Sequence, residues 1–145
     1  MRGPQKRVWC DASVDVTFGI AFGAFFSRGM RYPSVHRLQK LTSVEAELET
    51  ILLAVWNSPR ASMIMTDLSE IKHYLENWSE KDYIIQLRRA LQNKRSFIRY
   101  CPPKWRSELY HKCHTTARTS MIRQRQLEAS NALEEVSLRK KRSRK

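Results

Sequence analysis

Apolar residues recur with two different periods along this chain. Near the N-terminus, residues 8–11 and 18–26 look like strands, and in the second run alternate apolar side chains share one face while Gly19 and Gly23 fall on the other. A neighbouring element can approach closely over glycines. We predict a third strand at 27–33 and a polar loop at 34–40. The apolar face of the second run consists of Phe18, Ile20, Phe22, Ala24 and Phe26.

Helical spacing begins at Thr42, which forms a capping box with Glu45 before a run of apolar residues at helical intervals. That helix ends at Asn57-Ser58-Pro59. The short apolar run 61–67 predicts a buried central strand, and a helix over 68–77 follows it. Further on we predict an amphipathic helix after residue 80, a strand over 96–101 and a long helix over 107–138.

This element order, β-β-β-α-β-α-α-β-α, predicts an α/β fold with a mixed sheet flanked by helices. The length of 145 residues fits one domain. We place that domain at 1–123 and assign 124–145 to a helical extension and a basic C-terminal tail.

The net charge of +13 predicts a polyanionic partner, with an anionic membrane surface as the rival. We expect no membrane partner and an intracellular protein, because no apolar stretch approaches the roughly 20 residues of a bilayer span and no signal core precedes Asp11. The three cysteines, Cys10, Cys101 and Cys113, indicate reduced thiols, and no Cys/His spacing indicates a zinc site.

Three carboxylates occupy informative places in this pattern. Asp11 ends the first predicted strand, Glu47 lies near the start of the first long helix, and Asp67 ends the central strand. If the two strands are neighbours, the three side chains converge and need a cation to remain ionised together. Hard oxygen ligands suit Mg²⁺ or Mn²⁺, and two ions about 4 Å apart would support phosphodiester hydrolysis.

From residue 6 to residue 121 the chain resembles type 1 ribonuclease H. The family's strand ending in Asp-Gly-Ser, its helical Ala-Glu-Leu and its Thr-Asp-Ser are similar to three segments here, Trp9-Cys10-Asp11-Ala12-Ser13, Ala46-Glu47-Leu48 and Thr66-Asp67-Leu68. The resemblance implies a ribonuclease H-like five-stranded sheet. It also implies an endonuclease in which Asp11, Glu47 and Asp67 bind two Mg²⁺ or Mn²⁺ ions and which cuts the RNA strand of RNA/DNA hybrids.

The chain departs from the family at the end of the site. In a gap-free alignment from Pro102, the family's loop His falls at Lys104 and its last Asp at His114. His114 would then complete the second metal site or shuttle protons, and Lys104 would hold a phosphate. The family's basic protrusion is expected to be absent, because Trp78 to Asp82 leaves little room for it.

Basic residues add predicted contacts with nucleic acid. Together with Lys104, we assign this role to Ser13, Arg88, Arg89, Lys94 and Arg95. The basic tail indicates a nuclear localisation signal or a nonspecific nucleic-acid arm. Residues 124–138 could serve as a spacer or a dimer contact, and the sequence specifies no protein partner. The tail residues are Arg139, Lys140, Lys141, Arg142, Arg144 and Lys145.

Each residue also has a simpler interpretation. Asp11 could sit in a turn, Asp67 could cap a helix, and His114 could be an ordinary surface residue. Glu45 and Glu49 compete with Glu47 as helix charges, and the basic helix could be a solvated face. Two alternative functions therefore stay open: a noncatalytic nucleic-acid-binding protein with the same fold, and a relative that cuts DNA.

Overall fold

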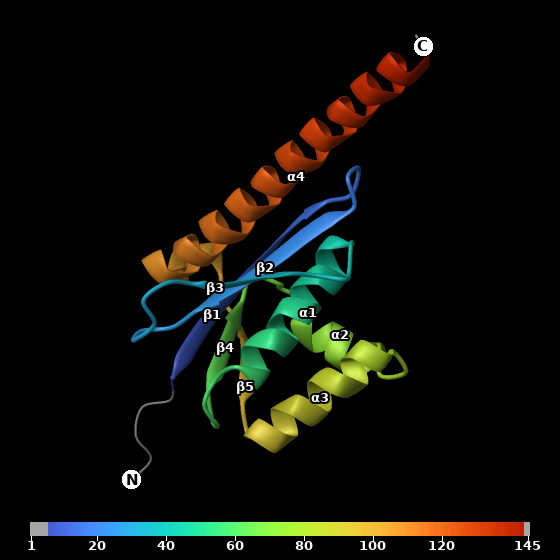
Figure 1. Cartoon of the computed structure of the whole chain (residues 1–145). Coiled ribbons are helices and arrows are strands. Elements are labelled where there is room, and N and C mark those ends of the chain that lie inside the picture. Colours follow the sequence, from blue (N-terminus) through green and yellow to red (C-terminus); the bar gives the residue numbers. More distant parts are fainter. Residues whose placement is uncertain (1–5, 144–145) are drawn as a thin grey trace.

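One five-stranded mixed sheet organises the molecule. The computed structural model describes residues 6–143, and its strand order is β3-β2-β1-β4-β5 (Figure 1). The first three strands pair antiparallel, whereas β4 pairs parallel with β1 and β5 parallel with β4. The strands are β1 (Arg7–Asp15), β2 (Ile20–Phe26), β3 (Ser34–Arg37), β4 (Met63–Thr66) and β5 (Phe97–Tyr100).

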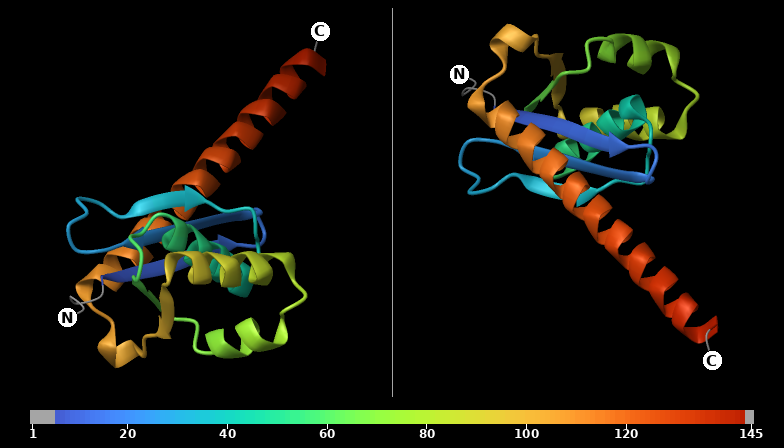
Figure 2. Two further views of the ribbon diagram at one scale, coloured as in Figure 1. Left: turned by 90° about the horizontal axis from the view of Figure 1, so that it is seen from below. Right: turned by 90° about the horizontal axis from the view of Figure 1, so that it is seen from above.

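Helices cover both faces of this sheet. On one face α1 packs against β1 and β2, and α3 packs on α1; on the other face α4 crosses β1 and β2 (Figure 2). The predicted α/β class, five-stranded mixed sheet and element order are confirmed. The helices are α1 (Ser43–Trp56), α2 (Ile71–Asn77), α3 (Asp82–Lys94), a short 3-10 turn (Pro103–Trp105) and α4 (Glu108–Ser143).

Two strand predictions were wrong in position. The third strand is Ser34–Arg37, within the predicted loop, because it pairs with the free edge of β2 and His36 stacks on Phe25 at 5.6 Å. Asp11 lies within β1 and does not end it, since pairing with β2 continues to Asp15. Phe18 lies in the turn before β2, where its N–H donates to Asp15 Oδ1 at 3.0 Å.

The predicted helix start at Thr42 is confirmed, and it fixes how α1 meets the sheet. The Thr42 hydroxyl oxygen accepts the Glu45 N–H at 3.3 Å, as an N-cap should. The close approach expected at the glycines occurs at Gly23, where an added Cβ would overlap the side chain of Thr50 in α1. The glycine therefore lets α1 lie directly on β2, and this position faces Thr50 of that helix.

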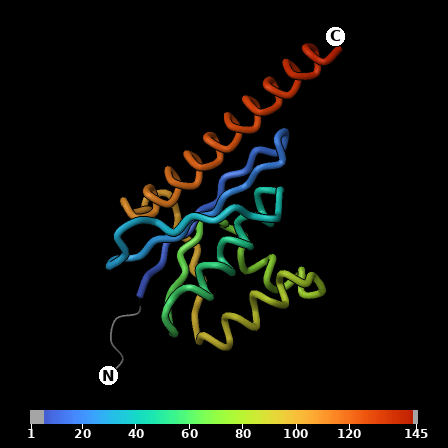
Figure 3. Tube along the Cα trace, in the orientation of Figure 1, coloured from blue at the N-terminus to red at the C-terminus, as the bar shows by residue number. Residues whose placement is uncertain are grey.

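Helix α4 has a packed beginning and an exposed end. Cys113, Ala117 and Met121 are buried on the sheet, and Arg125 and Glu128 form ion pairs with strand residues. From residue 130 to residue 143 every side chain is exposed, and the helix passes the predicted end at 138 without a break (Figure 3). Within the described part of the chain, no helix is both long and apolar enough to cross a membrane.

Candidate metal centre

The site begins where two parallel strands separate. The pairing of β1 with β4 runs from Arg7↔Met63 to Trp9↔Met65 and ends there. Beyond this point β1 continues to Asp15, whereas β4 ends at Thr66. The backbone groups of β1 that face β4 consequently need another partner, because a buried peptide N–H without an acceptor is costly.

Glu47 of α1 supplies that partner. Its Oε2 accepts the backbone N–H of Ala12 at 3.0 Å, and its Oε1 accepts the hydroxyl of Thr66 at 3.0 Å. The Cys10 thiol lies 3.9 Å from Oε1 on the same side. The buried Glu47 carboxylate thus bridges the diverging ends of β1 and β4, which fixes both its depth and its orientation.

Asp11 approaches the same point from β1. It is buried, and its Oδ2 lies 2.6 Å from Nδ1 of His114 in α4. The two side chains differ in exposure, at 4% for Asp11 and 47% for His114. His114 therefore connects the buried carboxylate with solvent.

Asp67 completes the cluster from the end of β4. Its Oδ2 accepts the hydroxyl of Tyr110 at 3.0 Å, and the Tyr110 ring stacks on His114 with 6.2 Å between centroids. One oxygen from each of Asp11, Glu47 and Asp67 lies within 4.8 Å of the others. The structure thus brings together the three predicted carboxylates and places His114 beside them, bonded to Asp11.

Burial and mutual repulsion change the acidity of this cluster. Burial, followed by the charge of Asp67, raises the pKa of Asp11 from 3.8 to about 7, although the contact with His114 opposes the rise. Burial and the charges of Asp67 and Asp11 raise the pKa of Glu47 well above its usual range. Burial, with the same carboxylates, also raises the pKa of the Tyr110 hydroxyl, which stays a hydrogen-bond donor at neutral pH.

This donor set fits a hard divalent cation. Carboxylate oxygens are the ligands that Mg²⁺ and Mn²⁺ prefer, and a cation would remove the repulsion that raises these pKa values. Hydrogen bonds to ligating carboxylates orient them for a metal, and Thr66, Tyr110 and the Ala12 N–H donate such bonds here. Asp11, Glu47 and Asp67 are the residues that would hold the ion.

The predicted basic contacts lie in two places. Arg88 donates to the carbonyl of Leu75 at 3.1 Å and Lys94 donates to the carbonyl of Ser58 at 2.6 Å, so both bind backbone next to helix ends. Arg89 is exposed on α3, and Arg95 caps that helix with a left-handed φ of 50°. Their helix lies on the face of the sheet opposite α4. A nucleic-acid role for all four stays a prediction.

Ser13 and Lys104 lie on the other side. Ser13 is half-buried in β1, two residues after Asp11 and on the same face of the strand. Lys104 is exposed, with its Nζ 5.8 Å from the centroid of the Trp105 ring. In the tail, residues 139–142 are exposed and helical, while the predictions for Arg144 and Lys145 fall outside the described residues.

Sequence reasoning missed the groups that orient the carboxylates. Tyr110 lies one helical turn before His114, so its position on the same face of α4 was available from the spacing. Thr66 directly precedes Asp67 at the end of β4. Its position close to the carboxylates was therefore also available from the sequence. The use of the Ala12 N–H depends on the separation of β1 from β4, which no local pattern encodes.

A scan against protein-family models finds no match to this chain, and a search of curated proteins finds no significant match.

Proposed function

We propose that this protein is a metal-dependent endonuclease of the ribonuclease H type, which hydrolyses the RNA strand of RNA/DNA hybrids. The observation that carries the proposal is the convergence of Asp11, Glu47 and Asp67 where β1 and β4 separate. The order of the three carboxylates along the chain and their elements match the resemblance drawn from the sequence. The five-stranded sheet with helices on both faces is compatible with that type of enzyme.

The three carboxylates hold one or two divalent ions in this proposal. Bound Mg²⁺ or Mn²⁺ supplies a Lewis acid for the phosphoryl oxygen and a water of lowered pKa. The protein's own work is to keep the ligands in place: Thr66 and the Ala12 N–H orient Glu47, and Tyr110 orients Asp67. Loss of a group that orients a metal ligand commonly lowers metal affinity or activity by about 10- to 100-fold.

His114 has a different role from the three carboxylates in this proposal. Its Nδ1 is held at Asp11, so its Nε2 is the nitrogen left to exchange a proton with substrate or solvent. An imidazole is the side chain best suited to proton transfer near neutral pH. We assign it proton transfer in preference to direct ligation of the metal, because its Nδ1 is occupied by the hydrogen bond with Asp11.

Charge supports a nucleic-acid substrate. The chain carries a net charge of +13, and neutralising phosphates releases counterions, so binding should weaken steeply as salt is added. The basic end of α4, which includes Arg139 and Lys140, adds to this attraction. We propose that the same tail directs the protein to the nucleus.

Cleavage of a labelled RNA/DNA hybrid with Mg²⁺ or Mn²⁺ tests the proposal. Asp67→Asn should lower the rate by at least about 100-fold, because it removes a ligand. Asp82→Asn, at the exposed start of α3, is the matched control and should cut like the parent protein. Undiminished cutting by Asp67→Asn would refute the assignment. Duplex DNA and duplex RNA, assayed in parallel, separate this activity from that of a DNA-cutting relative.

One observation favours a second candidate function. His114 lies beside Asp11 in place of a fourth carboxylate, which lowers the negative charge available to a second cation. A noncatalytic protein that binds nucleic acid through the same fold would have this feature. Salt-sensitive hybrid binding without cleavage under either metal would establish that alternative.

A further inference from the structure

A cavity lies on the α4 side of the sheet, before the carboxylates along β1 and β4. It has a volume of about 420 Å³, within the range of small-molecule sites. Trp9 and Met65 line it, and each precedes a carboxylate of the candidate metal centre by two residues: Asp11 within β1, and Asp67 directly after β4. At about 3.3 Å per residue, the two places are about 7 Å apart along the strands.

The lining of this cavity combines positive charge with aromatic rings. Arg7 and Arg99 are its charged residues, and Trp105, which is 68% exposed, forms part of its wall. None of the described lining residues is acidic. Lys104, with its Nζ 5.8 Å from the centre of the Trp105 ring, brings a further positive charge to the rim. An anion with a flat aromatic part matches such a wall.

A buried donor without a partner points to a missing ligand. Trp9 is only 8% exposed, and its indole N–H makes no hydrogen bond with any described residue. A buried N–H without an acceptor is costly, so such groups are rare unless something else binds them. Trp9 lines the cavity, so this unpaired N–H belongs to a residue of the cavity wall.

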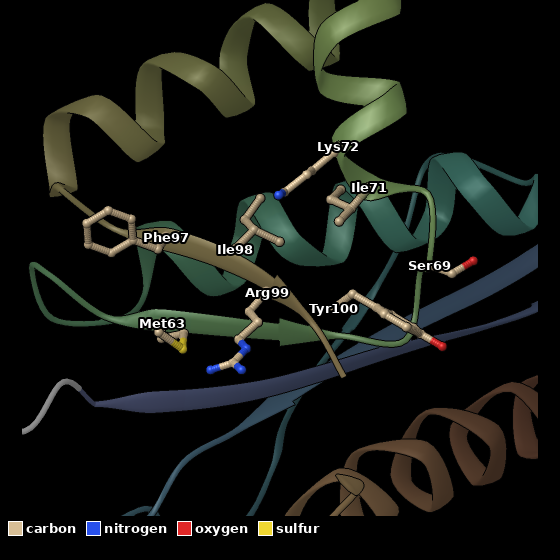
Figure 4. Close-up of a pocket in the computed structure, with 8 residues that line it drawn as sticks. All are labelled: Met63, Ser69, Ile71, Lys72, Phe97, Ile98, Arg99 and Tyr100. Atoms are coloured by element: carbon tan, nitrogen blue, oxygen red, sulfur yellow. The ribbon is translucent and has the colours of Figure 1, made fainter. Parts of the chain in front are cut away.

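A second groove at β5 differs from this cavity in one respect. Lys72, Phe97, Arg99 and Tyr100 are among its lining residues, so it also has positive charge and aromatic rings (Figure 4). None of the residues that line this groove has a buried polar atom without a partner. Of the two hollows, only the cavity on the α4 side therefore adds an unpaired donor to charge and aromatic surface.

We propose that the cavity on the α4 side binds a nucleotide, with its phosphate on Arg7 and Arg99 and its base against Trp105. Arginine guanidinium groups bind phosphate through paired N–H donors, and base stacking on an aromatic side chain is tolerant of sequence. The base or sugar offers the acceptor that the Trp9 N–H lacks. The site is separate from the carboxylates and does not rest on the proposed nuclease function.

The indole N–H signals of the four tryptophans offer a direct test by NMR. Adenosine 5′-monophosphate, added without metal in the presence of a chelator, should shift the signals of Trp9 and Trp105 saturably. Those of Trp56 and Trp78, on the α1 side, should stay in place. Inorganic phosphate alone and adenosine alone should each bind at least about tenfold more weakly, because each has only half of the recognised groups.

Variants then assign the contacts, with the Trp9 signal as the reporter. Trp105→Ala and Arg99→Gln should each weaken binding about tenfold or more, whereas Trp105→Phe should retain most of it. Both residues are exposed, so folding should survive, and Trp56→Phe and Arg60→Gln, two other exposed positions, serve as matched controls. Asp67→Asn should bind the nucleotide normally even if it cannot cut, which separates the two proposals.

Three results would overturn the proposal. The first is no saturable shift at Trp9 with the nucleotide. The second is unchanged affinity in both Trp105→Ala and Arg99→Gln. The third is phosphate alone binding as tightly as the nucleotide, which would mean that the aromatic wall takes no part.

Discussion

The two faces of the sheet are built in different ways. The α1 face is covered by two layers, α1 and then α3, around aliphatic residues such as Ile51, Ile64 and Leu87 that are fully buried. The α4 face has one helix, with small residues such as Cys113 and Ala117 at the contact. Polar groups and a cavity lie at the margin of the single helix, whereas the residues between the sheet and α1 are mostly aliphatic and buried.

This contrast assigns stability to one face and chemistry to the other. Aliphatic burial contributes about 25 cal/mol per Å², so the closed α1 face supplies most of the stabilisation. The α4 face keeps Asp11 buried but lets His114 and Trp105 reach solvent. A binding site needs buried side chains that are held in place and a path from solvent to them. A sheet face covered by a single helix can provide both.

The largest expected difference between the faces is in packing. Ile51→Ala should lower the free energy of unfolding by about 2–5 kcal/mol, because the cavity it leaves is enclosed. Met121→Ala, near the margin of the α4 face, should cost about 1 kcal/mol, since its neighbours and solvent can fill the space. Urea denaturation measures both. Equal losses would contradict the assignment of stability to the α1 face.

The carboxylates should make stability depend on pH and on metal. Since the pKa of Asp11 rises from 3.8 to about 7 on folding, the folded protein binds more protons than the unfolded chain between those values. Without metal, stability should therefore fall as pH rises through that window, by about 10 °C in Tm. Mg²⁺ binds the ionised cluster, so it should raise Tm more at about pH 8 than at about pH 5.

Thermal unfolding with a chelator or with Mg²⁺ gives these shifts. Asp11→Asn should flatten both dependences, and Asp82→Asn, far from the cluster at the start of α3, should leave them intact. A Tm that rises with pH in the metal-free protein would reverse the expected sign and remove the case for a buried, repulsive cluster.

A smaller effect should follow from a substitution at His114, the solvent-exposed residue of the site. His114→Asp places a fourth carboxyl group beside Asp11 and should tighten Mn²⁺ or Mg²⁺ binding by about tenfold, because affinity rises with ligand charge. In the metal-free protein the same change should lower Tm through repulsion. His111→Asp, exposed on the same helix, controls for added charge. Isothermal titration measures the affinity, and equal effects of the two variants would argue against a local cause.

The smallest effect on stability should come from the end of α4. Removing residues 132–145 should change the free energy of unfolding by less than about 0.5 kcal/mol, because every described side chain there is exposed. The shortened protein should bind a hybrid more weakly and with a shallower dependence on salt, since it loses basic residues. A truncation that also removes Met121 should, by contrast, destabilise the fold. Denaturation curves and salt titrations distinguish these cases.

The sequence predicted which helices and strands form better than it predicted where the strands begin and how they pair. Capping at Thr42 and the apolar spacing behind it are local, so α1 was placed correctly. The third strand was misplaced because Ser34–Arg37 has little apolar alternation of its own and is held by the edge of β2. Asp11 looked like a strand end because the separation of β1 from β4 is a property of two distant segments.

The same limit applies to the site. Their places in the predicted elements, together with the family resemblance, identified the three carboxylates that the structure brings within 4.8 Å of one another. These two signals could not identify the Ala12 N–H as a donor to Glu47, or the Trp9 indole as a donor without a partner, because both depend on which backbone and side-chain groups remain uncovered after folding. Tyr110 was within reach of sequence reasoning, since it lies four residues before His114.

Helix α4 runs unbroken and straight from the carboxylates to the basic end (Figure 1). At 1.5 Å per residue, the rise from His114 to Arg139 is about 38 Å, which equals the length of about 11 base pairs at 3.4 Å each. Under the proposed nuclease function, a duplex that contacts both the carboxylates and the basic end of α4 would be bound about one double-helical turn away from the point of cleavage. The length of α4 would then set the distance between the cut and this second contact.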